Sequence, residues 1–455
     1  MRNPKQDLGI ARDAVPQPIH AKLIAMQRLF GNIGWLLGGR GFNAALSLVY
    51  LALATRTLGL DGFGYFALIV ALGQTVTGLA NFQTWQFVVR WGSEGDTADA
   101  TGFAIALDGL SVALGLMLAA GLTWSAQFWL PLPGDLRLVA FLYCLVSLLS
   151  IRSTPTGLLR LRFAYGLATT AEAVQPLIRA LGAIAAVFFM PDVVGFVIAW
   201  ALAEVAVAIA LWIAAAQKSP IDFSRISLRH IPRNHPGAWS FVWATNLSGS
   251  LAVGGKQVLL LLVGAIGGEA LAGGFRVAAQ LGQALVQLAQ TISKAIYPEL
   301  VHARDAALDI ARRTARIALF GGTIAVVVAL LFGRWGLEAV AGPEFSGVYW
   351  AMVILAVGGA FELVGASLES LLVSARRAGT AFFIRAVPTL LALGLLDVAM
   401  EWNGLKGAAL TVLGSSALAV IGFYAAVMSL SQITITLPEK EAATRKPHPG
   451  KGDVT

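Results

Sequence analysis

The chain has 455 residues, of which 57% are hydrophobic and only 13% are charged, and this composition excludes an ordinary soluble domain. Soluble domains carry about 25% charged residues, which they need to cover their surface. The formal net charge is +8. Because the basic residues are distributed among the loops between apolar segments rather than collected on one face, we expect no nucleic-acid partner.

Residue types that support disulfide, metal or nucleophile chemistry are scarce. One cysteine, Cys144, excludes an internal disulfide. The five histidines all lie between or outside the apolar segments, and only His230 and His235 share a loop, with no second ligand pair beside them. We therefore expect no metal ion, no cofactor and no catalytic residue.

Residues 1–30 are polar and basic, and a short amphipathic piece at residues 24–30 is expected to lie at the membrane surface. About twelve apolar segments follow, most of them long enough at 1.5 Å per residue to cross a hydrocarbon core about 30 Å thick. The predicted spans are Gly31–Thr55, Gly62–Val89, Gly102–Gly121, Leu138–Leu158, Phe163–Met190, Val193–Ala216, Ala238–Val263, Ala270–Tyr297, Ile317–Phe332, Val348–Val373, Thr380–Met400 and Gly407–Leu430. The sequence thus predicts an all-α polytopic membrane protein.

Lysine and arginine in the loops predict the orientation of these spans. One side carries most of the loop cations, namely those of the N-terminal segment together with Arg90, Arg160, Arg162, Lys218, Arg225, Arg229, Arg233, Arg304, Arg312, Arg313, Arg316, Arg376, Arg377, Lys440, Arg445, Lys446 and Lys451. The other side carries Arg56, Arg137, Arg334 and Lys406. Cytoplasmic loops are enriched in lysine and arginine, so both termini are expected in the cytoplasm.

An internal repeat relates the two halves of the chain at a spacing of 209 residues. The matched positions are Gly59 with Gly268, Gly64 with Gly273, Phe66 with Phe275, and Leu72-Gly73-Gln74 with Leu281-Gly282-Gln283. Six spans per half give both halves the same orientation, which implies a pseudo-two-fold axis along the membrane normal. We expect two six-helix lobes around a central cavity.

The repeat divides the chain into five expected regions. They are a cytoplasmic or interfacial N-terminal segment (1–30), a first lobe with helices 1–6 (31–216), a cytoplasmic interlobe loop (217–237), a second lobe with helices 7–12 (238–430) and a disordered cytoplasmic tail (431–455).

A polar stripe runs along the eighth predicted span. Its members lie within roughly 40° of Arg276 at about 100° per residue. They are Arg276, Gln280, Gln283, Gln287, Gln290 and Lys294. The two cations at its ends lie about 27 Å apart along the axis, nearly the depth of the hydrocarbon core. Lipid does not accept such a stripe, so it is expected to line a water-filled path.

Other spans also contain charges, each of which costs about 2.5–3.5 kcal/mol at the bilayer centre unless it is paired or hydrated. Glu172 and Arg179 share one face of the fifth span and can pair. Glu362 and Glu369 share one face of the tenth span and are expected to pair with cations of the same lobe. Arg385 lies near the inner boundary, where it can also reach water.

Four cations are harder to explain by pairing, because no acid lies within the first, second, seventh or eighth predicted span. They are Arg40, Lys256, Arg276 and Lys294. Arginine matches phosphate oxygens with a planar fork, and glutamine amides suit sugar hydroxyls. The candidate substrate-binding residues are therefore Arg40, Lys256, Arg276, Gln280, Gln283, Gln287, Gln290, Lys294 and Arg385.

Residues 40–68 resemble the opening of the Wzx-like oligosaccharide flippases, the polysaccharide transporter branch of the multidrug/oligosaccharidyl-lipid/polysaccharide exporter superfamily. The residues that fit its Arg-x-Leu-Gly-Pro-x-x-Phe-Gly-x-Tyr pattern are Arg56, Leu58, Gly59, Phe63, Gly64 and Tyr65, with Leu60 in place of the usual proline. The end of the eighth span, Ile296-Tyr297-Pro298, is similar to the close of the corresponding family helix.

The resemblance implies two helical bundles that alternate access to a central cavity in the bacterial cytoplasmic (inner) membrane. The implied substrate is a polyprenyl-diphosphate-linked oligosaccharide, moved from the inner to the outer leaflet for O-antigen, lipopolysaccharide or exopolysaccharide biosynthesis. The implied partners are this lipid, the bilayer and polysaccharide-assembly membrane proteins. Relatives often carry an acid early in the seventh span, where this chain has Gly255-Lys256-Gln257, so acid-based ion coupling is not carried over.

Two other functions stay open. A cation-coupled multidrug exporter of the same superfamily needs an acidic pocket in the first lobe, and Asp108 and Glu172 are available there. A membrane polysaccharide polymerase or ligase needs a large outer loop with catalytic groups. The predicted outer loops are short, so we expect no enzymatic activity.

Overall fold

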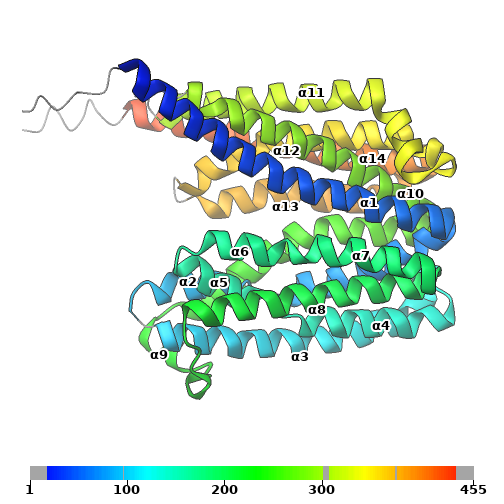
Figure 1. Ribbon diagram of the computed structural model, residues 1–455, viewed down its shortest axis with the longest axis horizontal. Helices are drawn as coiled ribbons and strands as arrows, with labels where there is room; N and C mark the ends of the chain where they lie inside the picture. Colours follow the sequence, from blue (N-terminus) through cyan, green and yellow to red (C-terminus); the bar gives the residue numbers. More distant parts are fainter. Residues whose placement is uncertain (1–17, 96, 301–306, 375–376, 437–455) are drawn as a thin grey trace, which may run out of the picture. The chain divides into compact units, whose positions relative to one another are not determined.

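The computed structural model describes residues 18–95, 97–300, 307–374 and 377–436, which are helical almost throughout and contain no strand (Figure 1). The α-helices are α1 (Pro18–Ala80), α2 (Trp85–Gly92), α3 (Thr97–Trp129), α4 (Gly134–Leu149), α5 (Ser153–Leu161), α6 (Tyr165–Glu172), α7 (Val174–Phe189), α8 (Val193–Lys218), α9 (His230–Asn234), α10 (Ala238–Leu300), α11 (Ala307–Ala341), α12 (Tyr349–Ser374), α13 (Ala378–Gly394) and α14 (Leu396–Thr436). Two short 3-10 helices, η1 (Phe223–Arg225) and η2 (Pro343–Val348), lie between them.

Nine apolar helical stretches of the described chain are long enough to cross a membrane, and α13 is a shorter apolar helix. Both α1 and α10 are interrupted by a residue with non-helical backbone angles. If each of these is counted as two segments and α13 is added, about twelve membrane-crossing segments result, as the apolar pattern predicts. The expected fold class, an all-α polytopic membrane protein, is confirmed.

The interruptions in α1 and α10 lie at equivalent positions of the sequence repeat. Gly59 has φ 66° and ψ −170°, and Gly268 has φ 85° and ψ 176°. Positive φ is costly for residues with a Cβ atom, so glycine is favoured where a helix breaks this way. The two glycines are 209 residues apart, which is the spacing of the repeat.

A second pair of repeat-related glycines brings α1 and α10 into backbone contact. A Cβ atom added at Gly64 would overlap the carbonyl oxygen of Glu269. One added at Gly273 would lie 2.9 Å from the carbonyl oxygen of Leu60. Gly64 corresponds to Gly273 and Leu60 to Glu269 in the repeat. The helix crossing therefore has the local two-fold symmetry that the repeat predicts.

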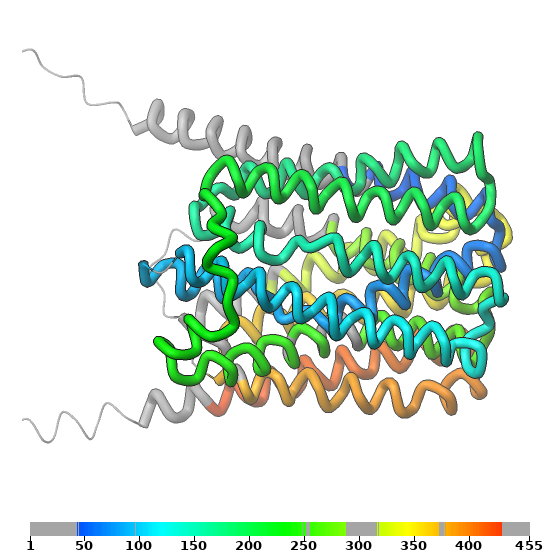
Figure 2. The backbone as a smooth tube through the Cα atoms, turned by 90° about the horizontal axis from the view of Figure 1, so that it is seen from below, coloured from blue at the N-terminus to red at the C-terminus, as the bar shows by residue number. Residues whose placement is uncertain are grey.

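Contacts divide the chain into two compact units, Met1–Phe42 and Asn43–Thr455, and the sites described below lie in the second. Within that unit, α3, α4 and α8 lie side by side, and α12 packs on α10, α11 and α14 (Figures 1 and 2). The expected domain boundaries at residues 30, 216, 237 and 430 stay a prediction.

Two predicted spans are each broken into two helices beside a proline. The fourth is divided between α4 and α5 at Ser150–Arg152, and the fifth between α6 and α7 at Ala173. Pro155 and Pro176 cause these breaks, because proline has no N–H to bond the carbonyl four residues earlier. The carbonyl that Pro155 leaves free, that of Ile151, accepts a 3.0 Å hydrogen bond from the Trp212 indole N–H.

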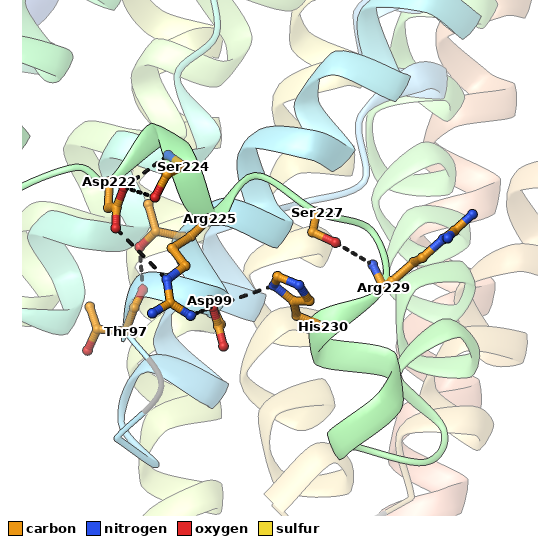
Figure 3. Close-up of polar contacts among 9 residues, drawn as sticks. Thr97, Asp99, Asp222, Ser224, Arg225, Ser227, Arg229 and His230 are labelled. Carbon is orange, nitrogen blue, oxygen red and sulfur yellow. Dashed lines mark hydrogen bonds and ion pairs between the residues drawn. The ribbon is translucent and has the colours of Figure 1, made fainter.

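The segment between α8 and α10 is fixed to the start of α3 (Figure 3). The Arg225 guanidinium lies 3.5 Å from Asp99 Oδ1, and His230 Nδ1 lies 3.7 Å from the same oxygen. Asp222 accepts hydrogen bonds from the backbone N–H and hydroxyl of Ser224, and these bonds lower the pKa of Asp222. The predicted interlobe loop thus contains ordered contacts, η1 and α9.

Candidate functional site

Two cavities, each lined in part by polar side chains, lie among the described helices. The first, of about 460 Å³, lies among α1, α3, α4, α5, α7, α8 and α10 and is called the first-half cavity. The second, of about 210 Å³, lies among α10, α12, α13 and α14 and is called the second-half cavity. Gln257 of α10 lines both cavities, so the two are adjacent at this residue.

The repeat places equivalent glutamines in the two walls. Gln74 lines the first-half cavity and Gln283 lines the second-half cavity. The two halves differ at the position seven residues before these glutamines. Ala67 is packed in the core, whereas its counterpart Arg276 lies in the wall of the second-half cavity. The two cavities are therefore related by sequence but differ in charge.

Two of the cations in the second-half cavity are paired with carboxylates of α12. Lys256 Nζ lies 2.8 Å from Glu362 Oε2, and an Arg385 guanidinium nitrogen lies 2.6 Å from Glu369 Oε2. This result confirms the prediction that Glu362 and Glu369 pair with cations of their own half. Neither cation keeps a full uncompensated charge for a ligand.

Arg276 differs from these two cations. Its Nη1 donates a 3.4 Å hydrogen bond to Gln257 Oε1. Within the described part of the chain, no carboxylate oxygen lies within 4.0 Å of its guanidinium. Arg276 is therefore a cation without a counter-charge, in the wall of one cavity and bonded to a residue that also lines the other.

A buried ion cluster lies in the first-half cavity. Glu204 of α8 forms an ion pair with Arg152 at 2.9 Å and accepts hydrogen bonds from Arg179 at 2.8 Å and from Gln175 Nε2 at 2.8 Å. The expected pairing of Arg179 with Glu172 is wrong, because Glu172 is exposed at the end of α6 and Arg179 instead reaches Glu204. The Arg179 guanidinium also lies over the Trp200 ring, 5.0 Å from its centroid.

Asp108 is the other acid of this cavity, and only 4% of its surface is exposed. Thr84 Oγ1 donates to its carboxylate at 2.8 Å, and Thr154 Oγ1 donates to its second oxygen. No cation of the described chain lies within ion-pair distance of it. Two hydroxyl groups, one from the N-cap residue of α2 and one from α5, thus take the place of a counter-charge.

The predicted stripe of α10 does not face a single cavity. Four of the predicted site residues line the second-half cavity: Lys256, Arg276, Gln283 and Arg385. Gln280 instead donates a 3.1 Å hydrogen bond to the Tyr50 hydroxyl of α1, and Gln287 is exposed. The side chains of Arg40, Gln290 and Lys294 lie outside those that the structure describes.

Several polar residues of the cavities are not in the predicted site. They include Gln257, Asp108, Arg152, Gln175, Arg179 and Glu204. The charged ones stand out in the sequence as ions within apolar spans, but their partners lie on other helices. Gln257 carries a weaker signal, its position beside Lys256.

Comparisons with known proteins agree with this fold. Residues 29–303 match the family profile described as polysaccharide biosynthesis protein. The inner membrane protein YghQ of Escherichia coli (strain K12) is 27% identical over 357 residues, which cover 71% of this chain and 96% of that protein.

Solved structures share the architecture at low sequence identity. The lipid II flippase MurJ, in an inward closed conformation, gives a TM-score of 0.69 at 12% identity and covers 86% of each chain. An inward-facing multidrug resistance transporter of the MATE family, from the MOP superfamily, gives a TM-score of 0.61 at 16% identity, covering 86% of this chain and 96% of that one. At these identities the likeness shows the fold.

Proposed function

The chain belongs to the family of polysaccharide biosynthesis proteins, and we propose that within it the chain acts as a flippase for a polyprenyl-diphosphate-linked oligosaccharide. It moves this lipid from the inner to the outer leaflet of the bacterial cytoplasmic membrane by alternating access, with both termini in the cytoplasm. The product serves surface polysaccharide synthesis, such as that of O-antigen or lipopolysaccharide. The names of YghQ and MurJ, an inner membrane protein and a lipid II flippase, support this proposal.

The uncompensated charge of Arg276 carries the proposal. An unpaired ion away from water is costly, and a protein keeps one in a membrane-spanning helix where a ligand or hydrated cavity stabilises it. A diphosphate supplies the missing negative charge, and its oxygens match the two parallel N–H groups of a guanidinium. The prenyl chain of such a substrate stays in the lipid.

The membrane potential favours the proposed direction. An inside-negative potential favours outward movement of negative charge by about 2.3 kcal/mol per charge per 100 mV. A diphosphate-linked substrate is therefore driven outward even without a coupling ion. The flippase needs no catalytic group, since no covalent bond changes.

We expect the change Arg276→Ala to abolish most flipping in a strain that lacks its own oligosaccharide flippase. Loss of a charge-assisted hydrogen bond weakens substrate binding by about 10- to 100-fold. Lipid-linked oligosaccharide then accumulates in the cytoplasmic leaflet and surface polysaccharide falls, which leaflet-specific labelling and immunoblotting measure.

Arg334→Ala is the matched control, because the Arg334 side chain is 74% exposed and pairs with Glu338 of its own helix. This variant is expected to produce surface polysaccharide at the wild-type level. A normal polysaccharide level in the Arg276→Ala strain, at wild-type protein abundance, contradicts the proposed role of Arg276.

A cation-coupled multidrug exporter is the second candidate function, and Asp108 is the observation that favours it. A buried carboxylate beside two threonine hydroxyls can exchange a proton or a small cation during transport. In that case Asp108→Asn removes drug resistance from an exporter-deficient strain, whereas Asp135→Asn, at the exposed start of α4, does not. If the wild-type chain confers no drug resistance, this candidate is rejected.

A further inference from the structure

Ion pairing leaves the two cavities with different charges. Arg152 and Arg179 in the first-half cavity share the carboxylate of Glu204, and the cavity also contains the carboxylate of Asp108, which pairs with neither arginine. The formal sum of these four groups is zero. In the second-half cavity, the acids of α12 neutralise Lys256 and Arg385, and Arg276 remains.

Three of the four buried side-chain atoms without a hydrogen-bond partner in the first-half cavity are uncharged oxygens. Gln74 Oε1, Ser111 Oγ and Ser147 Oγ are inaccessible in the structure and have no hydrogen-bond partner. They come from α1, α3 and α4, and all three side chains line this cavity. Arg179 Nε is also without a partner, although Glu204 already neutralises its guanidinium.

Buried polar atoms in native proteins almost always have a hydrogen-bond partner, and a buried polar atom without one destabilises the fold. Three such oxygens and one N–H, converging from different helices, match a ligand with several hydroxyl groups. A ligand hydroxyl can donate to the glutamine carbonyl oxygen and can both donate to and accept from a serine hydroxyl. An anionic ligand would instead need an unpaired cation, and the described part of this cavity offers none.

Gln257 links the unpartnered oxygens of the first-half cavity to Arg276, the cation without a counter-charge in the second-half cavity. This residue lines both cavities, and its carbonyl oxygen accepts from Arg276. A ligand that binds Arg276 through one end can therefore place its adjoining part in the first-half cavity. The repeat supplies a glutamine to both walls, Gln74 and Gln283, but places the arginine on one side only.

We infer that the two cavities form one bipartite site, in which Arg276 binds the diphosphate and the first-half cavity binds the adjoining sugars, which are uncharged. This inference rests on the proposed flippase function and assigns a substrate class to it. A uronic acid next to the diphosphate would bring its carboxylate to a place where both arginines already share Glu204. Neutral hexoses or acetamido sugars satisfy Gln74, Ser111 and Ser147.

Binding of three synthetic lipids to the purified full chain in nanodiscs tests this inference. The probes are a polyprenyl diphosphate without sugar, the same lipid with a neutral disaccharide, and the same lipid with a hexuronic acid as its first sugar. The double variant Ser111→Ala/Ser147→Ala removes two hydroxyls with little change in volume. We expect it to bind the neutral disaccharide lipid about tenfold more weakly and the sugar-free lipid unchanged.

Two further variants complete the experiment. Ser367→Ala is the control, because the Ser367 hydroxyl donates to the carbonyl of Leu363 in its own helix and lines neither cavity. It is expected to bind all three lipids as the wild type does. Arg276→Ala is expected to weaken the sugar-free and the neutral disaccharide lipids by the same factor.

The outcomes separate this inference from the proposed function. Equal weakening of both lipids by the double serine variant, or no weakening, overturns the sugar site while binding of the sugar-free lipid through Arg276 still supports the flippase. Wild-type binding of the hexuronic acid lipid as tightly as the neutral one overturns the preference for uncharged sugars. A wild type that binds none of the lipids overturns the proposed function and this inference together.

Discussion

Replacing Glu204 with glutamine is expected to lower the free energy of unfolding by about 3 kcal/mol, because removing one partner of a buried ion pair leaves an uncompensated charge. Glu204 is buried, and its side chain is the shared partner of Arg152 and Arg179. The Arg179 side chain is 16% exposed, and within the described part of the chain no other carboxylate lies within ion-pair distance of it. The Arg152 side chain is 41% exposed, so water can replace part of its pairing.

Denaturant titration in detergent micelles measures this loss, and Glu362→Gln is the matched control. Glu362 pairs with Lys256, and both side chains are more than 40% exposed. Exposed ion pairs contribute about 0–1 kcal/mol, so the control is expected to unfold close to the wild type. If the free energy of unfolding of the Glu204→Gln variant also lies within about 1 kcal/mol of the wild-type value, the ion cluster does not stabilise the fold.

Replacing Gly64 with valine is expected to be the most damaging change at the crossing of α1 and α10. The Cβ atom would overlap backbone of Glu269, which cannot turn aside as a side chain can. The helices must therefore separate, which also disturbs the 3.2 Å hydrogen bond from the Tyr65 hydroxyl to Glu269 Oε1. The cost is expected at or above the upper end of the 1–3 kcal/mol that overpacking usually costs, about 3 kcal/mol or more.

Folded yield and unfolding in detergent measure this effect, with Gly109→Ala as the control. Gly109 lies in α3 with open space around its Cβ position, so alanine meets nothing there. Its higher helix propensity is expected to raise stability by up to about 1 kcal/mol. A Gly64→Val protein with the wild-type yield and unfolding midpoint contradicts the close backbone contact.

The helical fold follows from physics that a sequence displays directly. Apolar runs of membrane length give the crossing segments, since lipid offers no partners to the backbone except within a helix. The repeated glycines also predict local features of α1 and α10. Gly59 and Gly268 supply positive φ, while Gly64 and Gly273 supply the space for backbone contact. Both roles depend on the absence of a Cβ atom, so these structural features could be predicted from the glycines in the sequence.

Helical periodicity does not predict ion pairs between residues on different helices. A spacing of seven residues puts Glu172 and Arg179 on one face only while the helix is continuous, and Pro176 interrupts it. The true partner of Arg179 lies on α8, 25 residues later. Glu362 and Glu369 were predictable as partners because a single face of one helix meets two cations of its own half.

The candidate site was predictable to the level of one helix face. The stripe of α10 locates Arg276 and Gln283 in a cavity wall, but a turn of about 40° separates Gln280 from Arg276 and directs it to Tyr50. The first-half cavity is lined from seven helices, and each contributes only one or two polar residues. These polar residues follow no helical period along the chain, so the cavity that they line is identified only from the packing of the helices.

Translocation in proteoliposomes tests the proposed flippase function most directly. The purified chain is reconstituted with a labelled polyprenyl-diphosphate-linked neutral oligosaccharide in the inner leaflet, and an impermeant lectin or enzyme detects the lipid that reaches the outside. The proposal predicts rapid translocation by the wild type and a rate at least about tenfold lower for Arg276→Ala. A wild-type rate equal to that of protein-free vesicles, or an unchanged rate for Arg276→Ala, contradicts it.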